Sequence, residues 1–124
     1  MTNAIGKRRS ETPRPIAGLS AAAAAALTGV SFPLIHARPP CRRRVARARQ
    51  LAIYLHHVAM GASVLACARL FDRDRATIRL AILRVEDRRE IPAFDRAATR
   101  LEKALATQRD MVLGLLSEQT GAAR

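Results

Sequence analysis

Tryptophan is absent from this chain of 124 residues, and aromatic residues make up only 3% of it. Proteins that bind single-stranded nucleic acid stack successive bases on exposed aromatic side chains. The candidates here are four residues, Tyr54, Phe32, Phe71 and Phe94. Three of them lie in apolar patterns, so few are left for stacking. The shortage therefore argues against single-strand binding and favours a duplex as the nucleic-acid partner.

Cysteine is also scarce, with Cys41 and Cys67 as the two examples. Their spacing matches no zinc-binding pattern. Cys67 lies in an apolar helical pattern that is typical of a small buried side chain. Because the rest of the sequence looks cytosolic, we expect no disulfide. No residue pattern indicates a metal or a cofactor, so we expect neither.

Residue patterns that indicate catalysis are missing as well. The sequence shows no paired carboxylates in an apolar setting and no Ser/His/Asp or Cys/His arrangement. His56 and His57 are adjacent, so on a helix their side chains point about 100° apart and do not easily share one metal. No glycine-rich phosphate loop of the type G-x-x-x-x-G-K-[ST] occurs. We therefore expect that the protein is not an enzyme.

Acidic residues are few relative to basic ones, 10 against 22, which gives a formal net charge of +12. This imbalance indicates an anionic partner, and both nucleic acid and acidic lipid surfaces qualify. A lipid partner would use the alanine-rich, nearly uncharged segment 16–35 as an anchor. The alternative is that this segment forms a helix that packs its alanine face on the domain.

The densest run of positive charge leads directly into an amphipathic helix. Five arginines fall within eight positions without an acid among them: Arg42, Arg43, Arg44, Arg47 and Arg49. Pro39 and Pro40 disfavour helix just before this run, so ARPPCRRR should form an extended basic loop. Such a loop can follow a phosphate strand or enter a minor groove. The alternative is a solvated arginine run with no partner.

Apolar residues recur at helical spacing along most of the chain, and no alternating strand pattern is present. Helices are expected at 17–28 (ending near Gly29), 45–60, 63–71, from about 74, and from Pro92 to about 117, with a short turn at 30–36. In the last helix the apolar period includes Leu115 and Leu116. Residues 1–14 should be a disordered basic arm, and 119–124 a tail.

We therefore predict an all-α fold for residues 15–118, with a helix-turn-helix preceded by a basic loop and closed by a long C-terminal helix. The expected turn is Asp72-Arg73-Asp74. Ser63 and Asp74 are suited to cap the helices on its two sides, because their side-chain oxygens accept from free first-turn amides. In helix-turn-helix proteins the second helix of such a pair enters the major groove N-terminus first.

Two motifs make segment 42–86 similar to the C-terminal DNA-binding domain of the bacterial replication initiator DnaA. In that family a basic loop precedes a helix that begins V-A-R-x-R-Q, and Val45-Ala46-Arg47-Ala48-Arg49-Gln50 matches it. A short helix ending in A-F-G-G and the run R-D-H-T-T-V follow; the corresponding residues here read LFDRDRATI, from Leu70 to Ile78. The layout is similar over about residues 30–117.

The resemblance implies DNA contacts for named residues of this chain. Arg49 and Gln50 correspond to the contacting arginine and glutamine of the first motif. Arg75, Ala76 and Thr77 correspond to the residues that read bases in the major groove. The complete set of candidate DNA-binding residues is Arg42, Arg43, Arg44, Arg47, Arg49, Gln50, Arg73, Arg75, Ala76, Thr77 and Arg79.

This chain departs from the family pattern at three places. Arg75 replaces the histidine, Ala76 replaces the first threonine, and Asp72 stands where two glycines would be. The family's minor-groove arginine falls near Cys41, so Arg42 or Arg43 would take that role. These departures concern base recognition and leave the cationic loop intact.

Individual roles within the second motif have alternatives. Arg75 can pair with guanine O6 and N7, or with Asp72 or another acid at the surface. Thr77 can touch a thymine methyl or a phosphate, or its hydroxyl can serve the start of the helix. Arg79, one turn along from Arg75, can reach the DNA backbone.

Since the initiator's ATPase motif is missing, the resemblance implies a stand-alone, sequence-preferring binder of double-stranded DNA. It would act as a regulator or accessory factor in replication or transcription, in the cytoplasm with the nucleoid, and no membrane partner is expected. Two alternatives remain open. The chain could be a protein-interaction module that kept the fold and lost base readout, or a membrane-associated protein anchored by 16–35.

Overall fold

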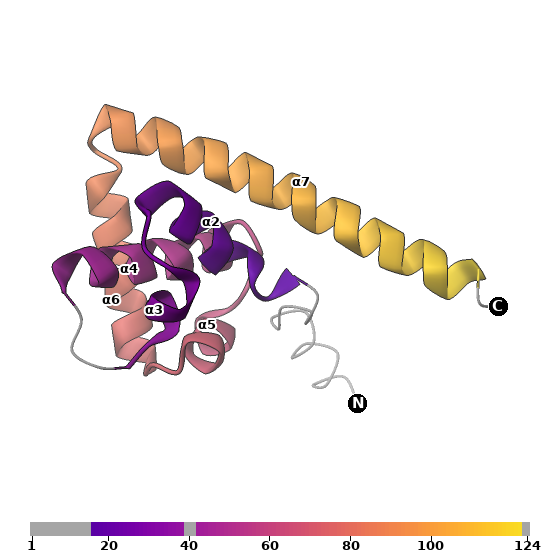
Figure 1. Ribbon diagram of the computed structural model, residues 1–124, viewed down its shortest axis with the longest axis horizontal. Coiled ribbons are helices and arrows are strands. Elements are labelled where there is room, and N and C mark those ends of the chain that lie inside the picture. The colour runs from indigo at the N-terminus through magenta and orange to yellow at the C-terminus, as the bar shows by residue number, and fades with distance from the viewer. Residues whose placement is uncertain (1–15, 39–41, 123–124) are drawn as a thin grey trace.

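The computed structural model describes residues 16–38 and 42–122, and these form helices joined by short connections, with no strand (Figure 1). The helices are α2 (Leu19–Thr28), α3 (Phe32–His36), α4 (Arg43–Val58), α5 (Val64–Phe71), α6 (Arg75–Arg88) and α7 (Pro92–Ala122). The predicted all-α fold with a long C-terminal helix is confirmed. The arm predicted at 1–14 and the centre of the predicted basic loop, 39–41, lie outside the described residues.

Helix α4 is the centre of the domain and contacts each of the other five helices. Its apolar residues lie at i, i+3, i+4 and i+7, and Ala48, Leu51, Ala52 and Leu55 are fully buried. Burying a leucine side chain contributes about 1.5–3 kcal/mol to stability. The apolar positions that the sequence pattern predicts for this helix are therefore the ones that enter the core.

The start of α4 differs from the prediction. The helix begins at Arg43, so Arg43 and Arg44 belong to its first turn, and Arg42 is the N-cap residue in extended conformation. We expected these arginines in the loop because prolines disfavour helix before them. Arginine itself is a good helix former, however, and no proline lies between Pro40 and the end of this helix. The helix also ends at Val58, two residues earlier than expected, and Gly61 beyond it has a φ of 71°.

The alanine-rich segment packs against α4 through small side chains. Ala21, Ala24 and Ser20 of α2 are fully buried, and α2 ends at Gly29, which has the left-handed conformation (φ 74°) that favours glycine. The expectation that this segment forms a helix packed on the domain is confirmed. Among the helices of residues 16–38 and 42–122, none has the combination of length and hydropathy needed to cross a membrane.

The predicted caps of the two helices that flank the turn are confirmed, with Ser63 at the start of α5 and Asp74 at the start of α6. The hydroxyl of Ser63 accepts from the amide of Ala66 at 3.0 Å, and a carboxylate oxygen of Asp74 accepts from the amide of Thr77 at 2.7 Å. Acceptance of this hydrogen bond lowers the pKa of Asp74. Both helix starts therefore follow from local sequence.

Helix α7 packs on the domain from its start to Leu113, which is half-buried against the core. Ala98 and Leu105 are buried, and Arg109 donates to the carbonyl of Ala59 at 2.6 Å. The last turns of the helix extend past the other helices (Figure 1), and Leu115 is 62% exposed. Leu115 and Leu116 keep the predicted apolar period of α7, yet both are exposed, because they lie beyond the part of the helix that meets the core. The predicted tail is also too long, since residues 119–122 belong to α7.

Candidate nucleic-acid interface

Arg49 is a buried residue that holds α3 against α4, which corrects the DNA contact implied for it. Its guanidinium donates to the carbonyls of Ile35 (2.7 Å), Ala37 (2.9 Å) and Leu34 (3.3 Å). The side chain is only 7% exposed. Carbonyls at the end of a helix have no partner within the helix, and Arg49 supplies one to α3. We therefore leave Arg49 out of the proposed interface.

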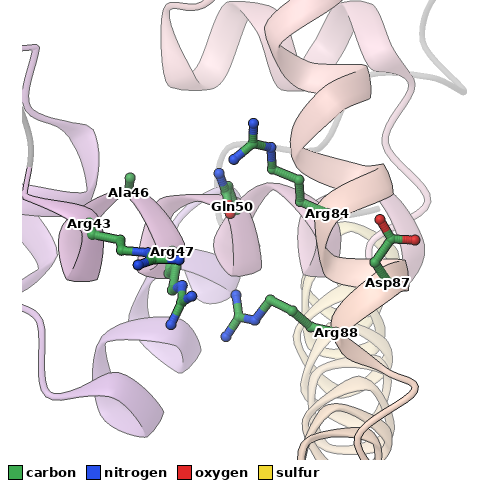
Figure 2. Close-up of a pocket in the computed structure, with 7 residues that line it drawn as sticks. All are labelled: Arg43, Ala46, Arg47, Gln50, Arg84, Asp87 and Arg88. Carbon is green, nitrogen blue, oxygen red and sulfur yellow. The ribbon is translucent and has the colours of Figure 1, made fainter.

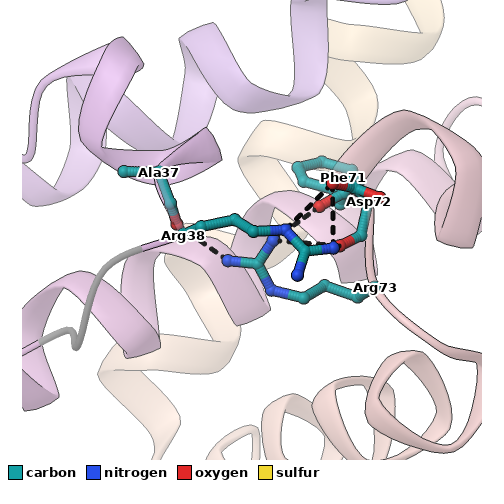
Figure 3. A network of polar contacts seen from close by, with 5 residues as sticks. All are labelled: Ala37, Arg38, Phe71, Asp72 and Arg73. Carbon is teal, nitrogen blue, oxygen red and sulfur yellow. Dashed lines mark hydrogen bonds and ion pairs between the residues drawn. The ribbon is translucent and has the colours of Figure 1, made fainter.

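Arg73 likewise serves the backbone. It donates to the carbonyls of Phe71 (2.8 Å), Asp72 (3.2 Å) and Ala37 (2.8 Å), as Figure 3 shows. Arg38 lies beside it and donates to the carboxylate of Asp72 at 2.9 Å and to the carbonyl of Asp72 at 3.0 Å. Arg73 is half-buried in this network, so it acts as a support of the turn and is also left out of the proposed interface.

The network of Arg38 and Arg73 places the beginning of the basic segment next to the start of α6. Residues 37 and 38 precede the segment 39–41, and both are bound to the turn at 71–73 (Figure 3). Ion pairs this exposed add little stability, but they fix relative position. The stretch that leads into the arginines and the N-terminus of α6 are therefore neighbours.

The first turn of α6 is open to solvent. Arg75, Ala76, Thr77 and Arg79 are all exposed, while Ile78 between them is fully buried and anchors the helix to the core. The amide of Thr77 is occupied by Asp74, so the backbone at this position serves the cap. The hydroxyl of Thr77 also hydrogen-bonds to the carboxylate of Asp74, so it serves the start of the helix. The side chains of Arg75, Ala76 and Arg79 point to solvent and are available to a partner.

The other end of α6 borders the beginning of α4, and together they form a groove lined with arginines (Figure 2). We call this cavity of about 240 Å³ the arginine groove; its lining residues are Arg43, Ala46, Arg47, Gln50, Arg84, Asp87 and Arg88. Arg84 and Arg88 reach from α6 toward α4 (Figure 2). A second hollow beside it shares three of these arginines and adds Thr28 and Arg44.

Two arginines of the groove, Arg84 and Arg88, are absent from the sequence-based candidates. They lie one helical turn apart, and Thr77 lies two turns before Arg84, so the three share one flank of α6. This spacing was readable from the sequence. The sequence does not show which flank of α6 meets α4, because that depends on the packing of the whole domain.

The remaining predicted residues near the start of α4 are accessible to different degrees. Arg42, Arg43, Arg44 and Arg47 are exposed, and Gln50 is half-buried in the arginine groove. Arg44 also donates to the carbonyl of Thr28 at 3.0 Å, which satisfies the end of α2. The candidate interface therefore consists of the exposed start of α6, the arginine groove and the first turn of α4.

The described parts of this interface are joined by α6. The helix has 14 residues, so at 1.5 Å per residue it is about 20 Å long, or about six base-pair steps of duplex. One end adjoins Arg38, and the other adjoins Arg43 and Arg47. A partner lying along this helix would meet positive charge at both ends.

Comparisons with known proteins leave the resemblance to the DnaA domain a prediction. Family models, curated proteins and solved structures were each searched with this chain, and none of the three searches gave a match.

Proposed function

We propose that this protein binds double-stranded DNA with a sequence preference, with α6 in the major groove and the start of α4 on the sugar-phosphate backbone. The observation that carries the proposal is that α6 is open to a partner at both ends: an exposed first turn with Arg75, and an arginine groove at the far end. Backbone contacts supply affinity, and side chains at the helix start supply preference.

Each residue has a role that follows from its chemistry. The guanidinium of Arg75 can donate twice to guanine O6 and N7, which is worth about 1–3 kcal/mol of discrimination between bases. Ala76 has no donor but allows close approach to a thymine methyl. Phosphates on either side of the DNA major groove would meet the positive charges of Arg79, Arg43 and Arg47.

The backbone of the turn also supports the proposed relationship to the DnaA domain. Asp72 has a φ of 53°, in the left-handed region that favours glycine, and the family motif has glycines at this point. A relationship of this kind is consistent with a stand-alone regulator or accessory factor. We propose no partner other than duplex DNA.

A selection experiment on a random duplex library tests this function. We expect enrichment of a short motif and, with about six phosphates neutralised, a log–log slope of affinity against salt near −5. Arg75→Ala should relax the preference at one position. Arg43→Ala should weaken all duplexes alike and reduce the slope by about 1.

The matched control is Arg100→Ala, which removes an exposed arginine of α7 that belongs to neither surface. It should leave the enriched motif in place. Binding without any enrichment would reduce the proposal to non-specific duplex binding. A protein that binds no duplex even at low salt would contradict it altogether.

A further inference from the structure

The arginine groove brings together more like charge than a folded domain needs. Arg43 and Arg47 from α4 and Arg84 and Arg88 from α6 line it, with Asp87 as its single acid among the described residues. Like charges gathered in one groove repel one another, and Arg88, the half-buried member of the four, is the least screened by water. Such a cluster is a net cost to the free protein unless an anion compensates it.

Arg88 shows this cost in its own contacts. Its guanidinium lies on the ring of Phe94, 4.3 Å from the centroid, and its Nη1 is buried without a hydrogen-bond partner. Burial and the charge of Arg47 together lower the pKa of Arg88. A buried donor without an acceptor costs about 1–3 kcal/mol, and an acceptor entering the groove would remove that cost.

The N-terminus of α4 adds a second source of positive potential. The N-cap residue Arg42 gives no side-chain oxygen to the amides of the first turn, and no acid lies in that turn. Arg43, the first residue of the helix, lines the groove. The positive end of a dipole of 16 residues therefore lies beside the arginines, where it favours an anion.

We propose that the arginine groove is a binding site for a phosphate group, formed by Arg43, Arg47, Arg88 and Gln50, and that it binds phosphate without DNA. Guanidinium groups match phosphate oxygens in pairs, and several converging arginines suit the tetrahedral oxygens of a phosphate better than the planar pair of a carboxylate. Gln50, which also lines the groove, can supply a neutral donor. The volume of about 240 Å³ accommodates one or two linked phosphates.

The source of this phosphate is either the DNA backbone or a free phosphate compound. In the first case the groove anchors one strand while the start of α6 reads bases. In the second, the groove is a separate site for a small phosphorylated ligand. The same variants separate the two sources, because the free anion can be titrated in the absence of DNA.

The test titrates sodium pyrophosphate into the full chain at constant ionic strength, with the arginine Nε–H resonances followed by NMR. We expect saturable shifts for Arg43, Arg47 and Arg88. Arg47→Gln and Arg88→Gln should each weaken binding about tenfold or more, since each removes a charge-assisted hydrogen bond. Arg100→Gln on α7 is the matched control and should bind as the wild type does.

The two groove variants complement each other, because Arg47 is exposed and its replacement does not touch the core, whereas Arg88 packs on Phe94. Shifts that do not saturate, or that are equal in all variants, would overturn the proposal. Loss of duplex affinity in the same two variants assigns the site to the DNA backbone. Unchanged duplex affinity assigns it to a free phosphate compound. Pyrophosphate binding in a protein that binds no duplex would leave this inference standing and contradict the proposed function.

Discussion

Replacing Arg89 with alanine should lower the free energy of unfolding by about 2–4 kcal/mol. The guanidinium of Arg89 donates to the carboxylate of Asp95 (2.7 Å), the hydroxyl of Thr99 (2.6 Å) and the hydroxyl of Tyr54 (2.9 Å), and it also pairs with Glu102. These partners come from α4 and α7, while Arg89 follows the last residue of α6. One side chain therefore joins three helices.

The size of this loss depends on how well water replaces Arg89 at the partners that the alanine variant leaves unpaired. The side chain of Arg89 is 20% exposed and that of Glu102 is 23% exposed, so water compensates only in part for the lost partner. Breaking a fully buried ion pair costs about 3–5 kcal/mol, and partial exposure reduces that figure. The hydrogen bond of Arg89 also opposes the rise in the pKa of Tyr54 that burial causes.

Urea unfolding followed by circular dichroism measures the change. Arg96→Ala, which removes an exposed arginine from the same part of α7, is the control and should change stability by less than about 0.5 kcal/mol. The loss of stability in Arg89→Lys should lie between the losses in Arg89→Ala and Arg96→Ala, because one ammonium group cannot reach four acceptors. A loss below about 1 kcal/mol for Arg89→Ala would contradict this account and show that the polar network of Arg89 contributes little to holding α7.

Acidification should destabilise the fold through His56 by about 3 kcal/mol between pH 6.5 and pH 4. His56 is 1% exposed, its Nδ1 lies 3.3 Å from the hydroxyl of Ser20, and its ring meets Phe71 edge to face. Burial, and to a smaller degree the charge of His57, lowers its pKa to about 4. The buried ring is therefore neutral at pH 7.

The direction of this dependence follows from proton binding. Between pH 6.5 and pH 4 the unfolded chain has His56 protonated while the folded chain does not, so the unfolded state binds more protons. The contribution of His56 is complete above pH 6.5 and is lost as the pH falls to about 4. The pKa of His36 is also lowered, by burial and by the charges of Arg49 and Arg73, and adds in the same direction.

Urea unfolding at pH 7, 6 and 5 measures this pH dependence of stability above the pH range in which most carboxylates titrate. His56→Gln keeps a polar group near Ser20 but removes the titration, so its stability should vary less with pH than that of the wild type. Equal pH dependence in the two proteins would mean that His56 accepts a proton without cost in the folded state.

Local features of this fold were predictable, and contacts between distant segments were not. The caps at Ser63 and Asp74 and the stop at Gly29 depend on a few neighbouring residues, so sequence patterns identify them. The role of Arg49 depends on carbonyls of α3 that lie 12 to 15 positions away. The sequence does not reveal such partners for an arginine in a basic run. The motif was therefore interpreted as a DNA contact.

The arginine groove was missed for the same reason. Arg84 and Arg88 lie on a predictable flank of α6, but only the packing of α6 across α4 brings them to Arg43 and Arg47 (Figure 2). Conversely, Leu115 follows the apolar period of α7 and is exposed all the same, because no described helix faces it. Periodicity shows which side of a helix is apolar, whereas burial also requires a neighbour.

The most direct test of the central claim is an NMR titration of the protein with a duplex that the selection enriches, with backbone amides followed residue by residue. The account predicts shifts in two segments, 42–50 and 75–88, and no shifts in residues 111–119 at the exposed end of α7. Shifts centred on α7, with 42–50 and 75–88 unchanged, would contradict the proposal that α6 and the arginines beside it bind DNA.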